Sequence, residues 1–246
     1  MNITEMHLAV QQGVDKINSF QADTLLSEEI DLELNKAINK FVNLKYGKNN
    51  IYTKGFEESQ KRVDDLRVLI KDVDLKLKFR DTTVNNVYTY ISSDLPEDYR
   101  FLLKALANVS HKSTCKTLNT EEQLQVGFLT DNDSKAIRRK SSMKFIQQDD
   151  ILAILSDPFN TTTKEKPLIT IEHDSIIVYT NDIFIIDTVK LTYIKNPAKV
   201  SLSLGVDCEL ADQTHQEIVD MTINSILEGI SDSRYTTQSL ELGKNE

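Results

Sequence analysis

The fold is decided by residues 183–231, which read IFIIDTVKLTYIKNPAKVSLSLGVDCELADQTHQEIVDMTINSILEGIS. Apolar and polar residues alternate from Ile183 to Lys195, Asn196-Pro197 interrupts them, and the alternation resumes over 199–204 until Gly205. A period of two is typical of a strand with one buried face. The stretch therefore predicts a strand, a tight turn and a second strand.

The second half of the stretch predicts an amphipathic helix over 211–231. Its apolar positions recur at threes and fours, and they are His215, Val219, Thr222, Ile223, Ile226 and Ile230. Thr214 and Asp212 are both suitable N-caps for this helix. An apolar stripe of four turns must be buried, and either the strands before it or the N-terminal helical region can supply the surface.

The N-terminal part has the period of helices. Residues 4–20 form the first, with Thr4 as a suitable cap, and residues 28–46 form the second, between Ser27 as cap and Gly47 as stop. The linker between them is short, which favours an antiparallel hairpin. A third helix is expected over 56–69. The first region, 1–71, is therefore predicted to be helical.

From residue 72 the period shifts to two. Strands are expected over 73–77, 84–91, 108–118 and 123–129, and a hairpin over 168–179, with short helices after Pro96 and over 147–155. The predicted class is α+β, with an N-terminal helical hairpin or bundle, a central antiparallel β-rich region with short helices, and a C-terminal helix. The boundaries are 1–71, 72–210 and 211–231, followed by a polar tail at 232–246.

Composition excludes several classes of protein. The chain has 246 residues, a net charge of -9, and 39% hydrophobic residues. The longest apolar run, Ile151–Leu155, is far shorter than the roughly 20 residues of a membrane span. Cys115 and Cys208 match no metal or redox spacing, and the N-terminus lacks the pattern of a signal peptide, which indicates synthesis in a reducing cytosol. The negative charge disfavours non-specific DNA binding.

No residue is predicted to be catalytic, cofactor-binding or metal-ligating, so we expect no cofactor and no enzymatic activity. Glu172, His173 and Asp174 are adjacent, and adjacent strand residues point to opposite faces, which makes a hairpin turn the better interpretation. His215 has no second ligand or base at helical spacing, so we expect a histidine of the first turn that is half buried against the sheet. The acidic turn at 131–134 lacks the glycine and glutamate that an EF-hand calcium loop requires.

Three stretches carry a resemblance to a known group of proteins. They are GFEESQKRVDDLR at 55–67, LPEDY at 95–99, and the segment from Leu204-Gly205 to THQEIVD at 214–220. In this order they resemble a structural protein of the crAss-like bacteriophages, which are short-tailed phages of gut Bacteroidales. Ala211 stands where that pattern has a proline. The order of helices, β region and helix is also similar to the head-to-tail connector (adaptor, or tail tubular) proteins of podoviruses.

The resemblance implies a function without catalysis. Connector proteins form twelve-subunit rings below the portal, through which double-stranded DNA passes without sequence recognition at genome ejection. The expected partners are other copies of the chain, the portal and adjacent tail proteins, and the expected location is the virion, after synthesis in the bacterial cytoplasm. Alternatives are another virion structural or cargo protein, such as a tail hub or capsid-associated protein, and a nucleic-acid-binding regulator.

Two groups of residues are candidate contacts with other subunits or with the portal. Arg138, Arg139 and Lys140 form the one tight basic cluster, which suits acidic groups on a neighbouring subunit better than DNA phosphate. Tyr235, Leu240 and Leu242 are spaced as anchors in a tail too polar to fold alone. We therefore expect the tail to dock on a neighbouring protein.

Overall fold

The computed structural model describes residues 1–15, 25–47, 60–82, 87–111, 139–181, 183–229 and 239. The chain divides into two compact units, one made of Met1–Ile70 with Asn196–Glu246 and the other of Lys71–Lys195. The first unit is helical and the second is built on a sheet, so the predicted α+β class is confirmed. Residues 196–210, which the sequence assigned to the β-rich region, belong to the helical unit.

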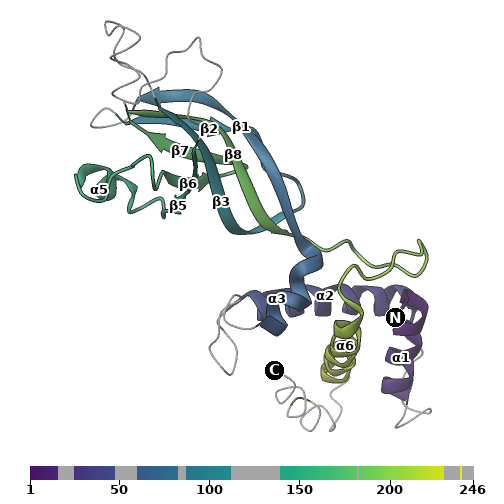
Figure 1. Cartoon of the computed structure of the whole chain (residues 1–246). Helices are drawn as coiled ribbons and strands as arrows, with labels where there is room; N and C mark the ends of the chain where they lie inside the picture. Colours follow the sequence, from purple (N-terminus) through teal and green to yellow (C-terminus); the bar gives the residue numbers. More distant parts are fainter. Residues whose placement is uncertain are drawn as a thin grey trace, which may run out of the picture. The chain divides into compact units, whose positions relative to one another are not determined.

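The helical unit takes its helices from both ends of the chain, as the colours of Figure 1 show. They are α1 (Ile3–Asp15), α2 (Ser27–Tyr46), α3 (Gln60–Leu66) and α6 (His215–Gly229). The 3₁₀ turns Arg67–Leu69 and Asp212–Thr214 follow α3 and precede α6. Each predicted helix of this region is confirmed where it is described, while positions 16–20, 56–59 and 230–231 lie outside the described residues.

Two of the predicted helix caps are wrong. Helix α1 starts with a capping box in which Glu5 N–H donates to Asn2 Oδ1 (2.8 Å) and Asn2 N–H donates to Glu5 Oε2 (3.0 Å). Asn2 therefore takes the place expected for Thr4. Ser27 is already inside α2, whose start is closed by Leu26 N–H donating to Glu29 Oε2 (3.0 Å). The end of α2 is confirmed, since Gly47 N–H donates to Asn43 O.

The apolar stripe of α6 packs on α1 and α2, so of the two surfaces expected for it the helical region supplies the one observed. Val219, Ile223 and Ile226 are buried, as predicted for the stripe. Helices α1 and α2 cover them with buried apolar side chains of their own. The fully buried side chains of α2 are Ile30, Leu34, Ile38, Phe41 and Val42. Helix packing on helix thus forms the core of this unit.

The second predicted strand of the opening stretch, residues 199–204, is also wrong. The segment forms only one isolated bridge, Ser201 with Val206, around Gly205 at φ 63°. Its backbone is bound instead by side chains of α2. Val200 N–H donates to Asn35 Oδ1 (2.9 Å), and Asn35 Nδ2 donates back to Val200 O (2.9 Å). A strand there would need the same backbone groups.

The second unit contains an eight-stranded sheet with the order β4-β3-β8-β1-β2-β7-β6-β5. Its strands are β1 (Ile70–Thr82), β2 (Tyr88–Ser92), β3 (Tyr99–His111), β4 (Arg139–Ser142), β5 (Lys144–Phe145), β6 (Leu168–Glu172), β7 (Ser175–Thr180) and β8 (Phe184–Lys195). The predicted hairpin is β6–β7. The helix expected after Pro96 is wrong, because β3 occupies those residues and pairs antiparallel with β8 along its whole length.

Residues 139–145, here called the closing strand, join the two ends of the sheet. As β4 they pair antiparallel with β3, with Lys140 opposite Asn108, and as β5 they pair parallel with β6, with Lys144 opposite Leu168. Met143 N–H, between the two, donates to Ala105 O (3.0 Å). One segment therefore binds both ends of the strand order, and the sheet closes into a barrel without a long free edge.

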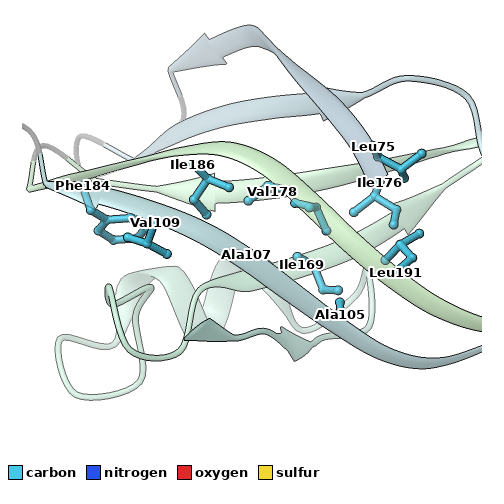
Figure 2. Packing of buried hydrophobic residues seen from close by; sticks show 11 residues of the cluster. Leu75, Ala105, Ala107, Val109, Ile169, Ile176, Val178, Phe184, Ile186 and Leu191 are labelled. Atoms are coloured by element: carbon cyan, nitrogen blue, oxygen red, sulfur yellow. The ribbon is translucent and has the colours of Figure 1, made fainter. Parts of the chain in front are cut away.

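The barrel interior is filled with side chains. The buried cluster consists of Leu75, Ala105, Ala107, Val109, Ile169, Ile176, Val178, Phe184, Ile186, Val189 and Leu191. Figure 2 shows side chains from strands far apart in the sheet order lying beside one another, as closure requires. Helix α5 (Ile151–Ser156), a shorter form of the helix predicted over 147–155, packs on a second cluster with Leu168, Ile177 and Tyr179.

Candidate functional site

The predicted basic cluster lies at the start of the closing strand. Arg138 is outside the described residues, Arg139 begins β4, and Lys140 is exposed. Ser141 is buried, with its Oγ donating to Lys164 O (2.7 Å), and Met143 packs against the barrel interior. The alternation places Lys140, Ser142 and Lys144 on the outward face. The exposed residues of the closing strand are Lys140, Ser142, Lys144 and Phe145.

This outward face is suited to a protein contact. Two lysines stand on it, and Phe145, which follows Lys144 at the end of the strand, is exposed although it is large and apolar. The backbone of this segment is hydrogen-bonded to β3 in its first half and to β6 in its second half. Aromatic side chains on rigid elements are typical of protein interfaces. The predicted tail anchors Tyr235, Leu240 and Leu242 lie outside the described residues, and their docking stays a prediction.

The acidic and histidine residues at 172–174 form the predicted hairpin turn. Glu172 binds Arg80 (Oε2 to Nη1, 2.7 Å), and His173 Nε2 lies 3.3 Å from Asp174 Oδ2 with both side chains exposed. His173 has a φ of 51°, a left-handed conformation that a non-glycine residue rarely adopts. Among the described residues, no group of three His, Cys, Asp or Glu side chains could hold a metal ion.

His215 has a structural role at the start of α6. Its side chain is buried, and its Nε2 lies 2.9 Å from Leu210 O. Asp212 Oδ1 is 3.6 Å from its Nδ1. The sequence predicted a half-buried ring packed on the sheet. The ring is instead fully buried in the helical unit, where it holds the turn that leads into the helix.

A polar clamp that the sequence did not reveal consists of His7 of α1 with Asp31 and Asn35 of α2. Leu202 N–H donates to both carboxylate oxygens of Asp31 (3.1 Å each), and His7 Nε2 lies 2.8 Å from Asp31 Oδ1. Asn35, one turn along, binds Val200. The signal in the sequence was a pair of short polar residues at i and i+4, which also occurs on ordinary solvated helix faces.

A second hidden group is a buried charge cluster of Lys45, Arg62, Asp65 and Glu217. Lys45 Nζ lies 2.8 Å from Glu217 Oε1 and 3.9 Å from Asp65 Oδ2, and it stands 5.0 Å from the centre of the Phe41 ring. The Arg62 guanidinium donates to the carbonyls at the end of α2. Lys45 follows Phe41 by four residues and continues the apolar stripe of α2. A charged residue in line with an apolar stripe was the feature of the sequence that pointed to a buried charge.

The barrel surface holds ion pairs with shifted pKa values. Lys71 binds Asp98 (2.9 Å) and lowers the pKa of that carboxyl. Tyr193 donates to Asp98 Oδ1 (2.8 Å), and burial together with this carboxylate raises the pKa of Tyr193 to about 12. Lys190 and Thr192 lower the pKa of Asp72. These shifts stabilise the charged and protonated forms that already exist at neutral pH, so none of the groups is prepared for proton transfer.

Comparison with known proteins leaves the family open. No family model matches the chain, and no curated protein matches it. Within the described part of the chain, no helix is both long enough and apolar enough to cross a membrane. The function is therefore argued from the residues and the fold.

Proposed function

We propose that this chain is a virion structural protein, a head-to-tail connector that assembles as a ring below the portal and surrounds the passage for the genome. One observation carries the proposal. Helices from both ends of the chain pack as one unit, and a closed β unit is inserted between them. The order of N-terminal helices, β region and C-terminal helix is the one that is similar to podovirus connector proteins, and the three stretches resemble a structural protein of crAss-like phages. The comparison of layouts is an analogy of fold alone. The resemblance of the three stretches adds that the chain is a structural protein of a phage.

The use of polar groups in the described residues supports a function based on contacts. The clamp of α2 binds the 200–202 backbone, and the charge cluster joins three helices, so both groups are engaged in holding the fold. The exposed apolar side chains, in contrast, lack such a role. The large ones are Leu8, Leu26, Leu32, Val68, Phe79, Phe145, Leu152, Phe159, Ile183 and Leu204. Subunit contacts in a ring would bury a share of them.

Phe159 is the most exposed of these side chains, at 92%. The turn that presents it is ordered by Asp157, whose Oδ1 accepts the Phe159 N–H (2.9 Å) and whose Oδ2 accepts Asn160 Nδ2 (2.6 Å). Holding a phenyl ring in water on an ordered turn reduces the entropy lost when a partner buries it. This geometry suits an anchor at a subunit contact.

The net charge of -9 is compatible with a passage for DNA. A wall that repels phosphate does not retain the genome, whereas a basic wall would bind it through release of counterions. The charge also disfavours the regulator, the alternative that would bind nucleic acid.

Assembly on the portal tests the proposal. The purified chain alone is expected to be a monomer or small oligomer, and a mixture with its portal is expected to show a ring in electron micrographs. Quantitative mass spectrometry of particles should give the portal's copy number. A copy number well below that of the portal, or a location away from the portal vertex, would instead identify a hub or cargo protein. A stable ring of the isolated chain would refute assembly templated by the portal.

Two variants test the contacts. Phe159→Ser should leave the thermal transition unchanged and weaken incorporation into particles, and Leu152→Ser, on the neighbouring α5 surface, is the matched control for loss of an exposed apolar side chain. Deletion of 234–246 should likewise spare the fold and weaken assembly. Unimpaired incorporation of the truncated chain would show that the tail is not a docking segment.

A further inference from the structure

The charge cluster brings an amine, a carboxylate and a second carboxylate together from three helices. Lys45 comes from the last turn of α2, Asp65 from α3 and Glu217 from the first turn of α6. Glu217 Oε1 accepts a hydrogen bond from Lys45 Nζ at 2.8 Å, and Asp65 Oδ2 lies 3.9 Å from the same nitrogen. Gln213 Nε2 donates to the other oxygen of Asp65 (2.8 Å), which fixes the orientation of this carboxylate.

The two reacting groups of the cluster, Lys45 and Asp65, are shielded from water. The side chain of Lys45 is 3% exposed and that of Asp65 is 2% exposed, while Glu217 is 20% exposed. The fully buried ring of Phe41 lies against the Lys45 amine. Among the described residues, Asp65 Oδ2 has no hydrogen-bond partner. A buried carboxylate oxygen at this distance from its cation bears a desolvation cost that the pair does not recover well.

We propose that Lys45 and Asp65 form an intramolecular isopeptide bond, and that Glu217 transfers the protons for this reaction. The proposal concerns a modification within one chain and does not rest on the proposed function. Its basis is the arrangement: the nucleophilic nitrogen faces an orphaned carboxylate oxygen, a proton acceptor is in hydrogen-bond contact with that nitrogen, and bulk water is excluded. Fixed proximity of this kind replaces an encounter between separate molecules.

The reaction balances without an oxidant or a co-reactant. The Lys45 ammonium gives one proton through Glu217 to Asp65 Oδ2, and the neutral amine then attacks Asp65 Cγ to form the new C–N bond. Glu217 takes a second proton from the nitrogen and delivers it to Oδ2, the C–Oδ2 bond breaks, and one water leaves. Glu217 is again a carboxylate at the end. An ammonium and a carboxylate have become a neutral amide and water.

The product removes the two charges that are hardest to bury. A neutral amide needs one donor and one acceptor partner, whereas the ion pair needs the solvation of two full charges. The bond also ties the end of α2 to α3 across residues 46–64. A covalent closure of that loop restricts the unfolded chain and should raise the unfolding temperature of the helical unit.

The intact mass of the purified full chain tests the proposal. We expect a mass lower than that of the sequence by one water molecule. A tryptic digest should contain a branched species in which the peptide with Lys45 is joined to the peptide with Asp65, and trypsin should not cleave after Lys45. The branched species distinguishes the isopeptide from any other loss of water.

Three variants separate the chemistry from a structural role. Glu217→Gln keeps a side chain of the same size and should have the full mass of its sequence with an unchanged helical circular dichroism spectrum. Glu228→Gln, an exposed position on the same helix, is the matched control and should still lose water. Asp65→Asn should lose ammonia instead of water, because the amide nitrogen becomes the leaving group.

The outcomes are distinct. A parent chain with the full mass of its sequence, both when freshly purified and after prolonged incubation, refutes the isopeptide. Loss of water in Glu217→Gln refutes the role of Glu217. Should Glu217→Gln fail to fold, loss of ammonia from Asp65→Asn would still support the bond, and its full mass would count against it.

Discussion

Gly13 on α1 lies against Ile223 of α6, and replacing it tests how the core of the helical unit is packed. A Cβ at position 13 would lie 2.2 Å from Ile223 Cδ1 and 2.9 Å from Ile223 Cγ1. Both atoms belong to a side chain of α6 that is buried. The first distance is far below contact distance, and the branched Cβ of isoleucine restricts its escape within a helix. Gly13→Ala should therefore destabilise the chain.

The magnitude follows from two opposed effects. Alanine in a helix interior is more favourable than glycine by roughly 0.5–1 kcal/mol. Overpacking of a core by an added carbon costs roughly 1–3 kcal/mol. The net effect should be a loss of about 1–2 kcal/mol in the free energy of unfolding, with overpacking the larger contribution. Ile223→Val removes the atom at 2.2 Å and alone should cost about 0.5–1.5 kcal/mol.

A double-mutant cycle measures the contact directly. The parent, both single variants and the double variant are unfolded in urea and followed by helical circular dichroism, since the chain has no tryptophan. The double variant should be more stable than the sum of the single effects by about 0.5–3 kcal/mol, the range for residues in contact. Gly229→Ala is the matched control, because nothing lies within 4 Å of its new Cβ. A stabilised Gly13→Ala with additive effects would refute the packing of α1 on α6.

Three further predictions use the same measurements. Ile226→Ala should cost about 2–5 kcal/mol because it leaves a cavity among α6, α1 and α2, while Glu228→Ala should be nearly silent; a loss below about 0.5 kcal/mol for Ile226→Ala would mean that this face is not packed. Asn35→Ala should cost about 1–3 kcal/mol and speed hydrogen exchange at the Val200 amide, whereas unchanged exchange would contradict the clamp. The pKa of Tyr193 is raised from 10.0 to about 12 in the folded chain, so its contribution to stability is complete below pH 10 and is lost as the pH rises toward 12. Tyr193→Phe should flatten that loss relative to the parent, and equal pH profiles would contradict the assignment.

The helices and the β6–β7 hairpin could be predicted because each is specified by its own residues. The stripe of α6 combines a period of 3.6 with residues that favour burial, and the hairpin combines two β-branched runs with a polar turn. Local period and local composition agree in both cases. Such agreement is the condition under which sequence patterns are reliable.

Strand β3 could not be predicted because its apolar residues fit both the period of a helix and the period of a strand. Tyr99, Leu102 and Leu106 have helical spacing, and Pro96 suits a helix start. Ala105, Ala107 and Val109 alternate equally well, and they point into the barrel. Pairing with β8 on one side and with the closing strand on the other decides between the two periods, and neither partner is close in sequence. The misreading thus follows from tertiary contacts overriding a local preference.

The segment 199–204 and the charge cluster were missed for a related reason. The alternation in 199–204 is real, yet its backbone hydrogen bonds are made to Asn35 and Asp31, which lie 165 or more residues away. Nothing within the segment distinguishes a strand neighbour from a helix side chain as the partner of those amides. Glu217 presents the same difficulty, because it resembles a solvated helix residue until α6 folds against α2, and only the place of Lys45 on an apolar stripe points to the cluster. In both places a polar residue on a helix face decides the local structure of a distant segment. The period of the helix or of the segment alone does not show this contact. The two can be predicted only together, from the polar residue and the backbone that it binds.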